Sequence, residues 1–250
     1  MASQRKREHG HVEERSKREQ RADRILDAAA ELMLRWGYNK TTIDDIARLA
    51  GVAKGTIYLH WKTREDLFLA LMEREYKRLT QDIQQRIASD PNGGTLEGII
   101  KHSMLATMKS PLMKAVLLRD TDLMGEWMRK EYASETYAQQ VAQSLALLEL
   151  YHARGVVRDD IDVRKMVYML DAITMGFLVI YQYIPEDFKY SDEEVAEMTA
   201  EAVKRTFAPS PSSDSQPDEQ TKQELANNFI SSIDTILSIR SQRNQEEATS

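Results

Sequence analysis

The fold is decided by one stretch of the sequence, residues 42–61, which reads TIDDIARLAGVAKGTIYLHW. Thr42 is a residue type that caps helices, and Asp45 follows three positions later, so the pair predicts a helix start of the capping-box type. Gly51 is predicted to end this helix, because glycine readily adopts the left-handed conformation found there. A second short helix is predicted over about residues 54–61. Together these features predict a helix-turn-helix.

The two sides of this stretch differ in chemistry. The side predicted to pack inward is apolar and comprises Ile46, Ala47, Val52, Ile57 and Trp61. The outward side of the second helix is small or polar and carries no acid: Lys54, Gly55, Thr56, Tyr58, Leu59 and His60. A cationic rim is predicted around it, formed by Arg48, Lys54, Lys62 and Arg64. An ordinary helical hairpin is the alternative, but such a face favours contact with base edges and phosphates.

Composition places the chain among globular proteins. It has 250 residues, 42% of them hydrophobic, with 10 glycines and 6 prolines, so it can bury a sizeable core. The absence of cysteine excludes disulfides and thiolate metal sites. No signal peptide is visible, and the longest apolar-rich run, residues 167–184, is interrupted by Asp171 and Gln182 and falls short of a membrane span. We therefore expect a cytoplasmic protein with no membrane partner.

The net charge of −6 hides an asymmetry along the chain. Residues 1–64 hold 14 Lys and Arg against 9 Asp and Glu, a net charge of +5, and the remainder holds 20 against 31, a net charge of −11. A basic end on an acidic body concentrates affinity for a polyanion at that end. The helix-turn-helix lies inside this basic part.

Periodicity of 3.6 residues recurs along the whole chain, so an all-α fold is predicted. Residues 1–17 are charge-dense and lack an apolar face, so they are expected to form a flexible basic arm, which either enters the minor groove or remains a solvated tail. A helix is predicted from about Arg18 to Gly37, and residues 18–62 are expected to form the DNA-binding domain. Residues 63–207 are predicted to form a helical domain with helices at 63–89, 95–109, 111–120, 123–154, 162–183 and 191–207.

The C-terminal end carries an addition to this helical domain. Residues 208–220 contain three prolines and four serines, a composition typical of a flexible linker. Residues 221–242 then predict an amphipathic helix. It can dock on its own subunit, on a dimer mate or on another protein, and packing within a dimer is the simplest of these.

The run from residue 24 to residue 72 resembles the DNA-binding domain of the tetracycline-repressor (TetR) family. The motifs that carry the resemblance are TTIDDIA at 41–47, AGVAKGTIYLHW at 50–61 and KTREDL at 62–67. The resemblance implies an all-α homodimer without an enzymatic activity. Three N-terminal helices bind double-stranded DNA in this family, and a larger C-terminal bundle binds a small-molecule effector and dimerises. The dimerising helices are expected near residues 162–183 and 191–207.

The resemblance also implies roles for single residues. Carried over by position, the base-reading residues are Lys54, Gly55, Thr56 and Tyr58. The phosphate-binding residues are Thr42, His60 and Lys62, with Tyr58 contributing to both sets. Two positions depart from the common pattern: Trp61 replaces the more frequent Phe, and Leu59 stands where polar or aromatic residues are usual, so it receives no role.

The effector pocket is the least specified part of the prediction. Flexible methionines can line adaptable apolar cavities, and polar residues inside apolar helices can provide specificity. The candidate pocket residues are His102, Met104, Met108, Met124, Trp127, Met128, Tyr168, Asp171 and Met175. For each of them, packing in an ordinary core is the alternative interpretation.

No pattern in the chain favours a metal, a cofactor or catalysis. Glu149 and His152 have the Glu-x-x-His spacing of di-iron bundles, but those sites need a second such pair, which this sequence lacks. We therefore predict no metal, no cofactor and no enzyme.

The predicted function is a repressor that an apolar or amphipathic effector releases from a near-palindromic operator, with recognition helices spaced at roughly 34–36 Å. The alternative is a DNA-binding protein of the same fold without an effector, acting in DNA architecture or cell division.

Overall fold

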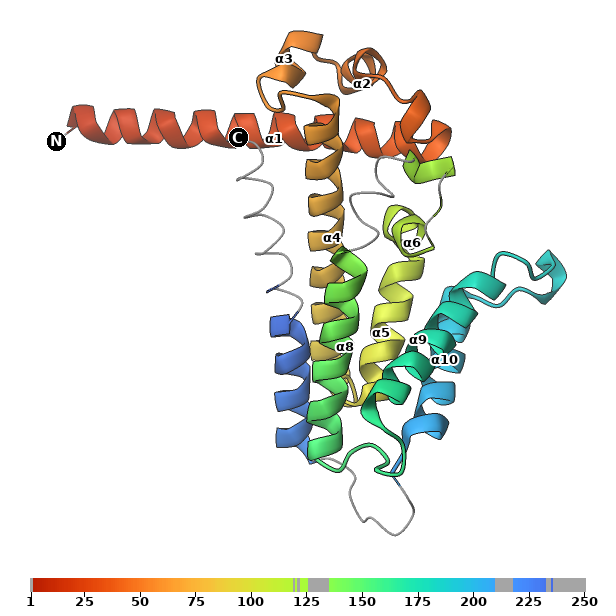
Figure 1. Ribbon diagram of the computed structural model, residues 1–250. Helices are drawn as coiled ribbons and strands as arrows, with labels where there is room; N and C mark the ends of the chain where they lie inside the picture. The colour runs from red at the N-terminus through yellow and green to blue at the C-terminus, as the bar shows by residue number, and fades with distance from the viewer. Residues whose placement is uncertain are drawn as a thin grey trace. The chain divides into compact units, whose positions relative to one another are not determined.

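A computed structural model of the chain describes residues 2–118, 120, 122–125, 135–209, 218–232 and 235. For residues 2–16, 135–137, 139–140 and 143 it describes the backbone alone. The described residues form helices and no strand, which confirms the predicted all-α fold (Figure 1). Within them, no helix is long and apolar enough to cross a membrane. The chain divides into two compact units: Met1–Arg74 with Asp120–Glu126, and Glu75–Arg119 with Trp127–Ser250.

The first unit contains the predicted helix-turn-helix. Its elements are α1 (Ala2–Trp36), the 3-10 helix η1 (Tyr38–Lys40), α2 (Ile43–Ala50), α3 (Lys54–Tyr58) and the beginning of α4 (Arg64–Ser89). Fully buried residues from α1, α2, α3 and α4 form the core of this unit: Ile25, Ala29, Met33, Ile46, Ile57, Leu67, Phe68, Leu71 and Met72. The small side chain of Ala47 is also buried, as the sequence predicted.

Helix α1 begins at Ala2, sixteen positions before the predicted start at Arg18. The expectation of a flexible segment over residues 1–17 was therefore wrong for the backbone of residues 2–17. The physical reason is local propensity: the segment is rich in Arg, Lys, Glu and Gln, which favour helix even without an apolar face. The predicted end is confirmed, because Gly37 takes a φ of 78° and its N–H donates to the Met33 carbonyl at 2.8 Å.

A distant part of the chain, residues 120–126, belongs to this first unit. Met124 is buried there, and the Asp122 carbonyl oxygen would lie 2.6 Å from a Cβ placed on Gly37. Any side chain at position 37 would therefore collide with the backbone of this segment. Sequence reasoning placed residues 63–207 in one domain and Met124 in the effector pocket, and both assignments differ from the observed division.

The second unit is a bundle of helices built around two apolar clusters (Figure 1). Besides the rest of α4 it contains α5 (Leu96–Met108), α6 (Pro111–Leu117), α8 (Glu135–Ala153), α9 (Val163–Ile180), the 3-10 helix η2 (Glu186–Phe188) and α10 (Asp192–Phe207). Helix α10 packs against α5 and α9, and α8 packs against α9. Buried members of the larger cluster include Ile99, Tyr151, Met166 and Phe207. The smaller cluster is centred on Met104, Met108, Leu178 and Val195.

The predicted helix boundaries of this unit hold best where a cap defines them. Ser191 and Glu194 form the predicted capping box at the start of α10, with the Glu194 N–H donating to the Ser191 hydroxyl at 3.2 Å. Helix α6 ends at Leu117, earlier than predicted. The predicted helix at 123–154 is described as α8 only from Glu135, and residues 126–134 lie outside the described part.

Residues 219–232 are helical and pack on the second unit of their own protomer. Leu225 and Ala226 are buried in the larger cluster, and the Arg154 guanidinium donates to the Glu224 carboxylate at 2.6 Å. The Lys222 ammonium donates to the Asn92 side-chain oxygen at 3.2 Å. Of the docking sites that the sequence left open, the described residues therefore occupy the one on the same subunit. Residues 210–217 of the predicted linker lie outside the described part.

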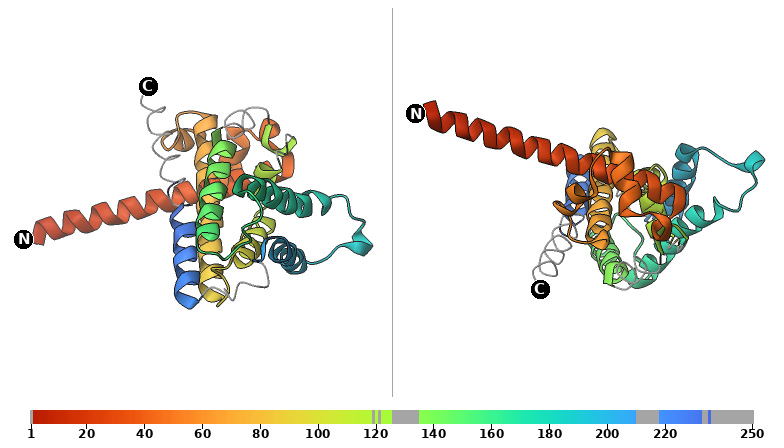
Figure 2. Two further views of the ribbon diagram at one scale, coloured as in Figure 1. Left: turned by 60° about the horizontal axis from the view of Figure 1, so that its bottom comes forward. Right: turned by 90° about the horizontal axis from the view of Figure 1, so that it is seen from above.

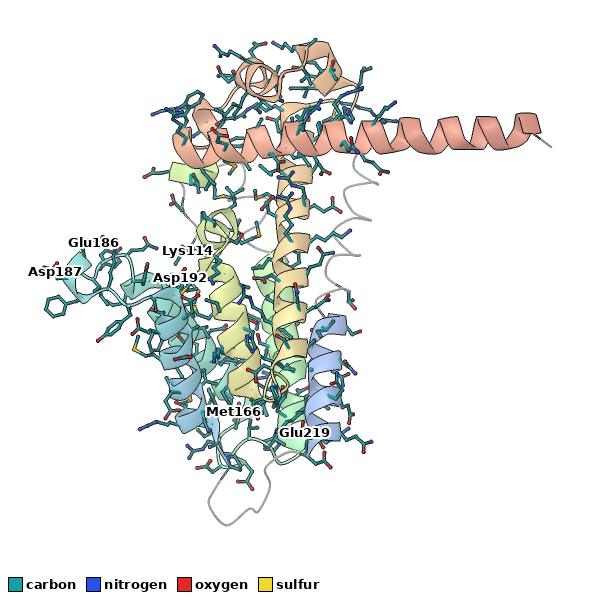
Figure 3. The ribbon with its side chains drawn as sticks, turned by 180° about the vertical axis from the view of Figure 1, so that it is seen from behind. Lys114, Met166, Glu186, Asp187, Asp192 and Glu219 are labelled. Carbon is teal, nitrogen blue, oxygen red and sulfur yellow. The ribbon has the colours of Figure 1, made fainter. Side chains whose placement is uncertain are left out.

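The connection between α9 and α10 projects from the helices of the second unit (Figure 2). Glu186 and Asp187 lie at its outer end, and Asp192 lies at the start of α10 (Figure 3). The connection exposes three aromatic side chains, those of Tyr183, Phe188 and Tyr190.

Candidate nucleic-acid interface

The start of α2 is fixed by the predicted cap. The Thr42 hydroxyl accepts a hydrogen bond from the Asp45 N–H at 3.2 Å and donates one to the Asp45 carboxylate at 2.5 Å. Thr42 has extended backbone angles, as expected at an N-cap position, and its side chain is exposed. Thr42 thus combines a structural role with a position from which it can reach a ligand.

The turn between α2 and α3 depends on Gly51. This residue has φ 66° and ψ 38°, the left-handed region that other residues rarely adopt. The Val52 N–H then donates to the Ala47 carbonyl at 3.0 Å, which closes the turn. The observed helix, left-handed glycine and second helix confirm the predicted helix-turn-helix.

Lys54, Gly55 and Tyr58 of α3 are exposed. Thr56 is half-buried, and Ile57 is buried in the core. The helix ends at Tyr58, three residues before the predicted end. The chain continues in a helical turn, because the Trp61 N–H still donates to the Ile57 carbonyl at 3.0 Å. Leu59, for which sequence reasoning proposed no role, is 73% exposed next to these residues.

Neither the backbone conformation nor the packing of the protein requires a glycine at position 55. A Cβ built on it meets no atom within 4 Å, and its φ does not lie in the positive region. A glycine inside a helix is less stable than alanine by roughly 0.5–1 kcal/mol. The fold therefore gains nothing from glycine at this position, and its value has to come from contact with another molecule.

His60 lies in the turn after α3, beside Trp61, with 5.2 Å between the ring centroids. Its pKa is lowered, first by partial burial and then by the nearby positive charges of Arg18 and Arg21. The imidazole is therefore mainly neutral at pH 7 and can contribute a hydrogen bond to a phosphate rather than a charge. The same effect shows that these two arginines of α1 act electrostatically at this surface.

Lys62 is exposed just before α4. The first turn of that helix is capped by Thr63, whose hydroxyl accepts from the Asp66 N–H at 3.0 Å. The Asp66 carboxylate in turn accepts a hydrogen bond from the Thr63 N–H at 2.9 Å, so these two amides are occupied by the cap, and the Lys62 side chain is the cation beside it.

Arg64 does not belong to the predicted cationic rim. Its guanidinium lies 3.9 Å from the centroid of the Tyr38 ring, and its Nε donates to the Thr41 carbonyl at 3.0 Å. Arg64 thus fixes the start of α2 to α4. Tyr38 is buried beneath it, and burial raises the pKa of the Tyr38 phenol to about 12.

Acidic residues of α2 reach this surface, which sequence reasoning missed. The Lys54 ammonium donates to the Asp44 carboxylate at 2.9 Å, and the Arg48 guanidinium pairs with Asp45. The hydrogen bond from Lys54 to Asp44 raises the pKa of Lys54. A contact over ten positions depends on how α2 and α3 cross, and no local pattern indicates it.

The predicted effector residues do not converge on one site. Met104 and Met108 are buried in the smaller cluster, while the His102 Nε2 lies 2.9 Å from the Asp90 carboxylate. Tyr168 is 78% exposed on α9. The remaining candidates are scattered: Asp171 and Met175 are half-buried on α9, Met124 lies in the first unit, and Trp127 and Met128 are outside the described residues.

A cavity of about 70 Å³ lies elsewhere in the second unit, among α5, α8 and α10. Its apolar walls include Leu96, Tyr151, Val157, Val203 and Phe207, and none of the predicted pocket residues lines it. The described part of the chain contains no group of three metal-ligating side chains.

Comparison with known proteins gives sequence matches to the segment that contains the helix-turn-helix and structural matches to about three quarters of the chain. The family model for bacterial regulatory proteins of the tetR family matches residues 25–71. The HTH-type transcriptional regulator QacR of Staphylococcus aureus is 45% identical over 53 residues, 21% of this chain and 28% of that protein. The fatty acid metabolism regulator protein of Bacillus subtilis is 38% identical over 66 residues, 25% of this chain and 34% of that protein. The chain thus aligns with about a third of the length of these two relatives.

The structural match extends further. The crystal structure of NalD, described as the secondary repressor of the MexAB-OprM multidrug efflux pump in Pseudomonas aeruginosa, superposes with a TM-score of 0.54 at 22% identity. It covers 77% of this chain and 98% of NalD. This likeness confirms the fold expected from the sequence.

Proposed function

The chain belongs to the tetR family of bacterial regulatory proteins, and we propose on that basis that it binds a specific operator and represses transcription. The observation that carries DNA reading is the outer face of α3. There Gly55 leaves open space that the fold does not need, between the exposed side chains of Lys54 and Tyr58. This face suits the close approach of a base edge. Repression is supported by the description of NalD, a repressor of the same fold.

The proposed contacts divide into two sets. Lys54, Gly55, Thr56 and Tyr58 read bases from α3. Thr42, His60 and Lys62 hold phosphates, the first as an exposed hydroxyl, the second as a neutral hydrogen-bond donor and the third as a cation. Phosphate contacts position the protein, and base contacts provide specificity.

The proposed active form is a homodimer that forms through α9. Exposed residues at helical spacing form an uncharged stripe on this helix, comprising Tyr168, Ala172, Gly176, Val179 and Tyr183 just beyond its end. Small residues lie at the centre of the stripe, and a Cβ on Gly176 would meet no atom within 4 Å, so a second helix can approach closely. An exposed uncharged stripe of this kind is typical of a protein interface. Two copies joined in this way present two α3 helices to the two half-sites of a near-palindromic operator.

The proposed effector is a small apolar or amphipathic molecule that binds in the second unit and releases the operator. The methionine-containing cluster around Met104 and Met108 supports this, because methionine side chains adapt to different ligands. An effector weakens DNA binding only through its differential affinity for two states of the dimer, typically by 1–3 kcal/mol of coupling.

The test of DNA reading is a binding titration at several salt concentrations. It uses the DNA upstream of the protein's own gene and random duplex of the same length. We expect tighter binding to the upstream DNA, with affinity for both duplexes falling as salt rises. Equal affinity for the two duplexes contradicts operator-specific binding.

A second candidate function, DNA binding without an effector, is favoured by the size of the described cavity. Its volume of about 70 Å³ is well below the roughly 300 Å³ at which drug-sized ligand pockets begin. A small-molecule screen by thermal shift separates the two functions. A compound that stabilises the chain and also releases the upstream DNA supports the effector function, and stabilisation without release favours the second candidate.

A further inference from the structure

We propose that Asp44 determines the specificity of DNA reading by positioning Lys54, an inference that rests on the proposed function. The two residues come from different helices, Asp44 from the first turn of α2 and Lys54 from the first position of α3. The Lys54 Nζ donates to the Asp44 Oδ2 at 2.9 Å. The base-reading lysine is therefore already bound to a carboxylate in the protein without DNA.

Both side chains are exposed, 50% for Lys54 and 67% for Asp44, so the pair lies on the outer surface of the helix-turn-helix. An exposed ion pair adds little to stability, which makes a structural reason for the contact weak. A carboxylate on a surface that approaches DNA repels phosphates, and this weakens binding to any duplex. The ion pair between Asp44 and Lys54 thus acts against general affinity without a matching gain in folding.

The advantage of the ion pair is that it restricts which groups of the DNA the Lys54 side chain can contact. A free lysine is a point charge on a flexible stem, and it pairs with whichever phosphate is nearest. When Asp44 binds it, the Lys54 ammonium keeps two further N–H donors. It is then less free to reach phosphates along the DNA backbone. The donors remain available for acceptors of a base edge, such as N7 and O6 of guanine. Asp44 therefore lowers binding to random duplex more than binding to the operator.

The experiment compares Asp44→Asn with Glu31→Gln, a matched control that removes the same charge from an exposed position of α1 in the same unit. Two probes are used: a duplex that the wild-type chain selects from a random-sequence library, and an unselected random duplex. For Asp44→Asn we expect affinity for the random duplex to rise about two- to fivefold. The ratio of the affinity for the selected duplex to that for the random duplex should fall. The slope of log affinity against log salt concentration should steepen by about one, because Lys54 then contacts a phosphate. Glu31→Gln leaves the ratio unchanged.

Two further variants separate positioning from a general charge effect. With Lys54→Met in the background, Asp44→Asn is expected to change both affinities by the same factor, because the residue that Asp44 positions is gone. Asp44→Glu keeps the carboxylate and is expected to restore much of the ratio.

The possible failures are distinguishable. An unchanged ratio in Asp44→Asn, or equal shifts in Asp44→Asn and Glu31→Gln, overturns the role of Asp44 alone. A wild-type chain that selects no preferred duplex overturns the proposed function and this inference together.

Discussion

Helices α3 and α9 both expose a face to solvent, but the two faces differ in chemistry. The face of α3 combines a cation, a glycine with open space and a phenol, whereas the stripe on α9 is uncharged and has small residues at its centre. A polyanion with a patterned surface suits the first face, and a second apolar helix suits the second. Exposure alone does not identify the binding partner of a helix face. The chemistry of its side chains does.

The largest expected effect comes from placing a charge on the α9 stripe. Ala172→Glu should dissociate the dimer and weaken operator binding by about 100-fold or more, because each half-site is then bound alone. Light scattering measures the mass, and a DNA titration measures the affinity. Ala146→Glu makes the same change at an exposed position of α8 and should leave both unchanged. A dimer that persists in Ala172→Glu contradicts the assignment of the stripe.

The next effect separates stability from DNA binding on α3. Gly55→Ala should raise the free energy of unfolding by about 0.5–1 kcal/mol and lower operator affinity at least about tenfold, because the new methyl occupies the space meant for DNA. Chemical denaturation and a DNA titration measure the two changes. Gly51→Ala is the contrasting variant and should destabilise the protein, because its φ of 66° is strained for alanine. A Gly55→Ala variant with full operator affinity contradicts the proposed reading face.

Smaller effects should distinguish base reading from phosphate binding. Lys62→Ala should weaken binding to all duplexes by about three- to tenfold and reduce the salt slope by about one. Thr56→Ala should change the preferred base at one operator position and leave the salt slope intact. Titrations on a panel of single-base operator variants test both, and the reversed pattern contradicts the two assignments.

The smallest effect concerns the carboxylate on α9. Burial raises the pKa of Asp171 above its ordinary value of 3.8, so the folded state holds this proton more tightly than the unfolded state. Stability therefore falls as pH rises from that value through the raised folded pKa. Asp171→Asn should stabilise the protein at pH 7 by less than about 1 kcal/mol, because water still reaches the carboxyl. Denaturation at pH 7 and pH 4 measures the gain, which should shrink at the lower pH.

The DNA-binding part was largely predictable because its signals are local. Thr42, Gly37 and Gly51 specify helix ends through their own backbone and cap preferences, without help from distant residues. The identity of the inward residues followed from helical spacing. The exposed site residues, Lys54 and Tyr58, then remained on the other side.

The rest depends on contacts that a local pattern does not encode. Helical periodicity shows which residues share a face, but not whether the protomer covers that face, so Tyr168 was placed in a pocket although it is exposed. The pairing of Asp44 with Lys54 and the position of Met124 both require the arrangement of separate segments. The start of α1 was missed for a different reason, because propensity outweighed the lack of an apolar face.

The segment at residues 120–126 matters for any attempt to transfer the DNA-binding unit to another protein. The DNA-binding unit is not one continuous stretch of sequence, since Met124 and the Asp122 backbone come from a short helical segment, residues 122–125, that follows α6. A fragment that stops at Arg74 leaves part of its own interior uncovered. Exchange of operator specificity between proteins of this fold should therefore transfer this segment together with residues 1–74, or replace only the exposed side chains of α3.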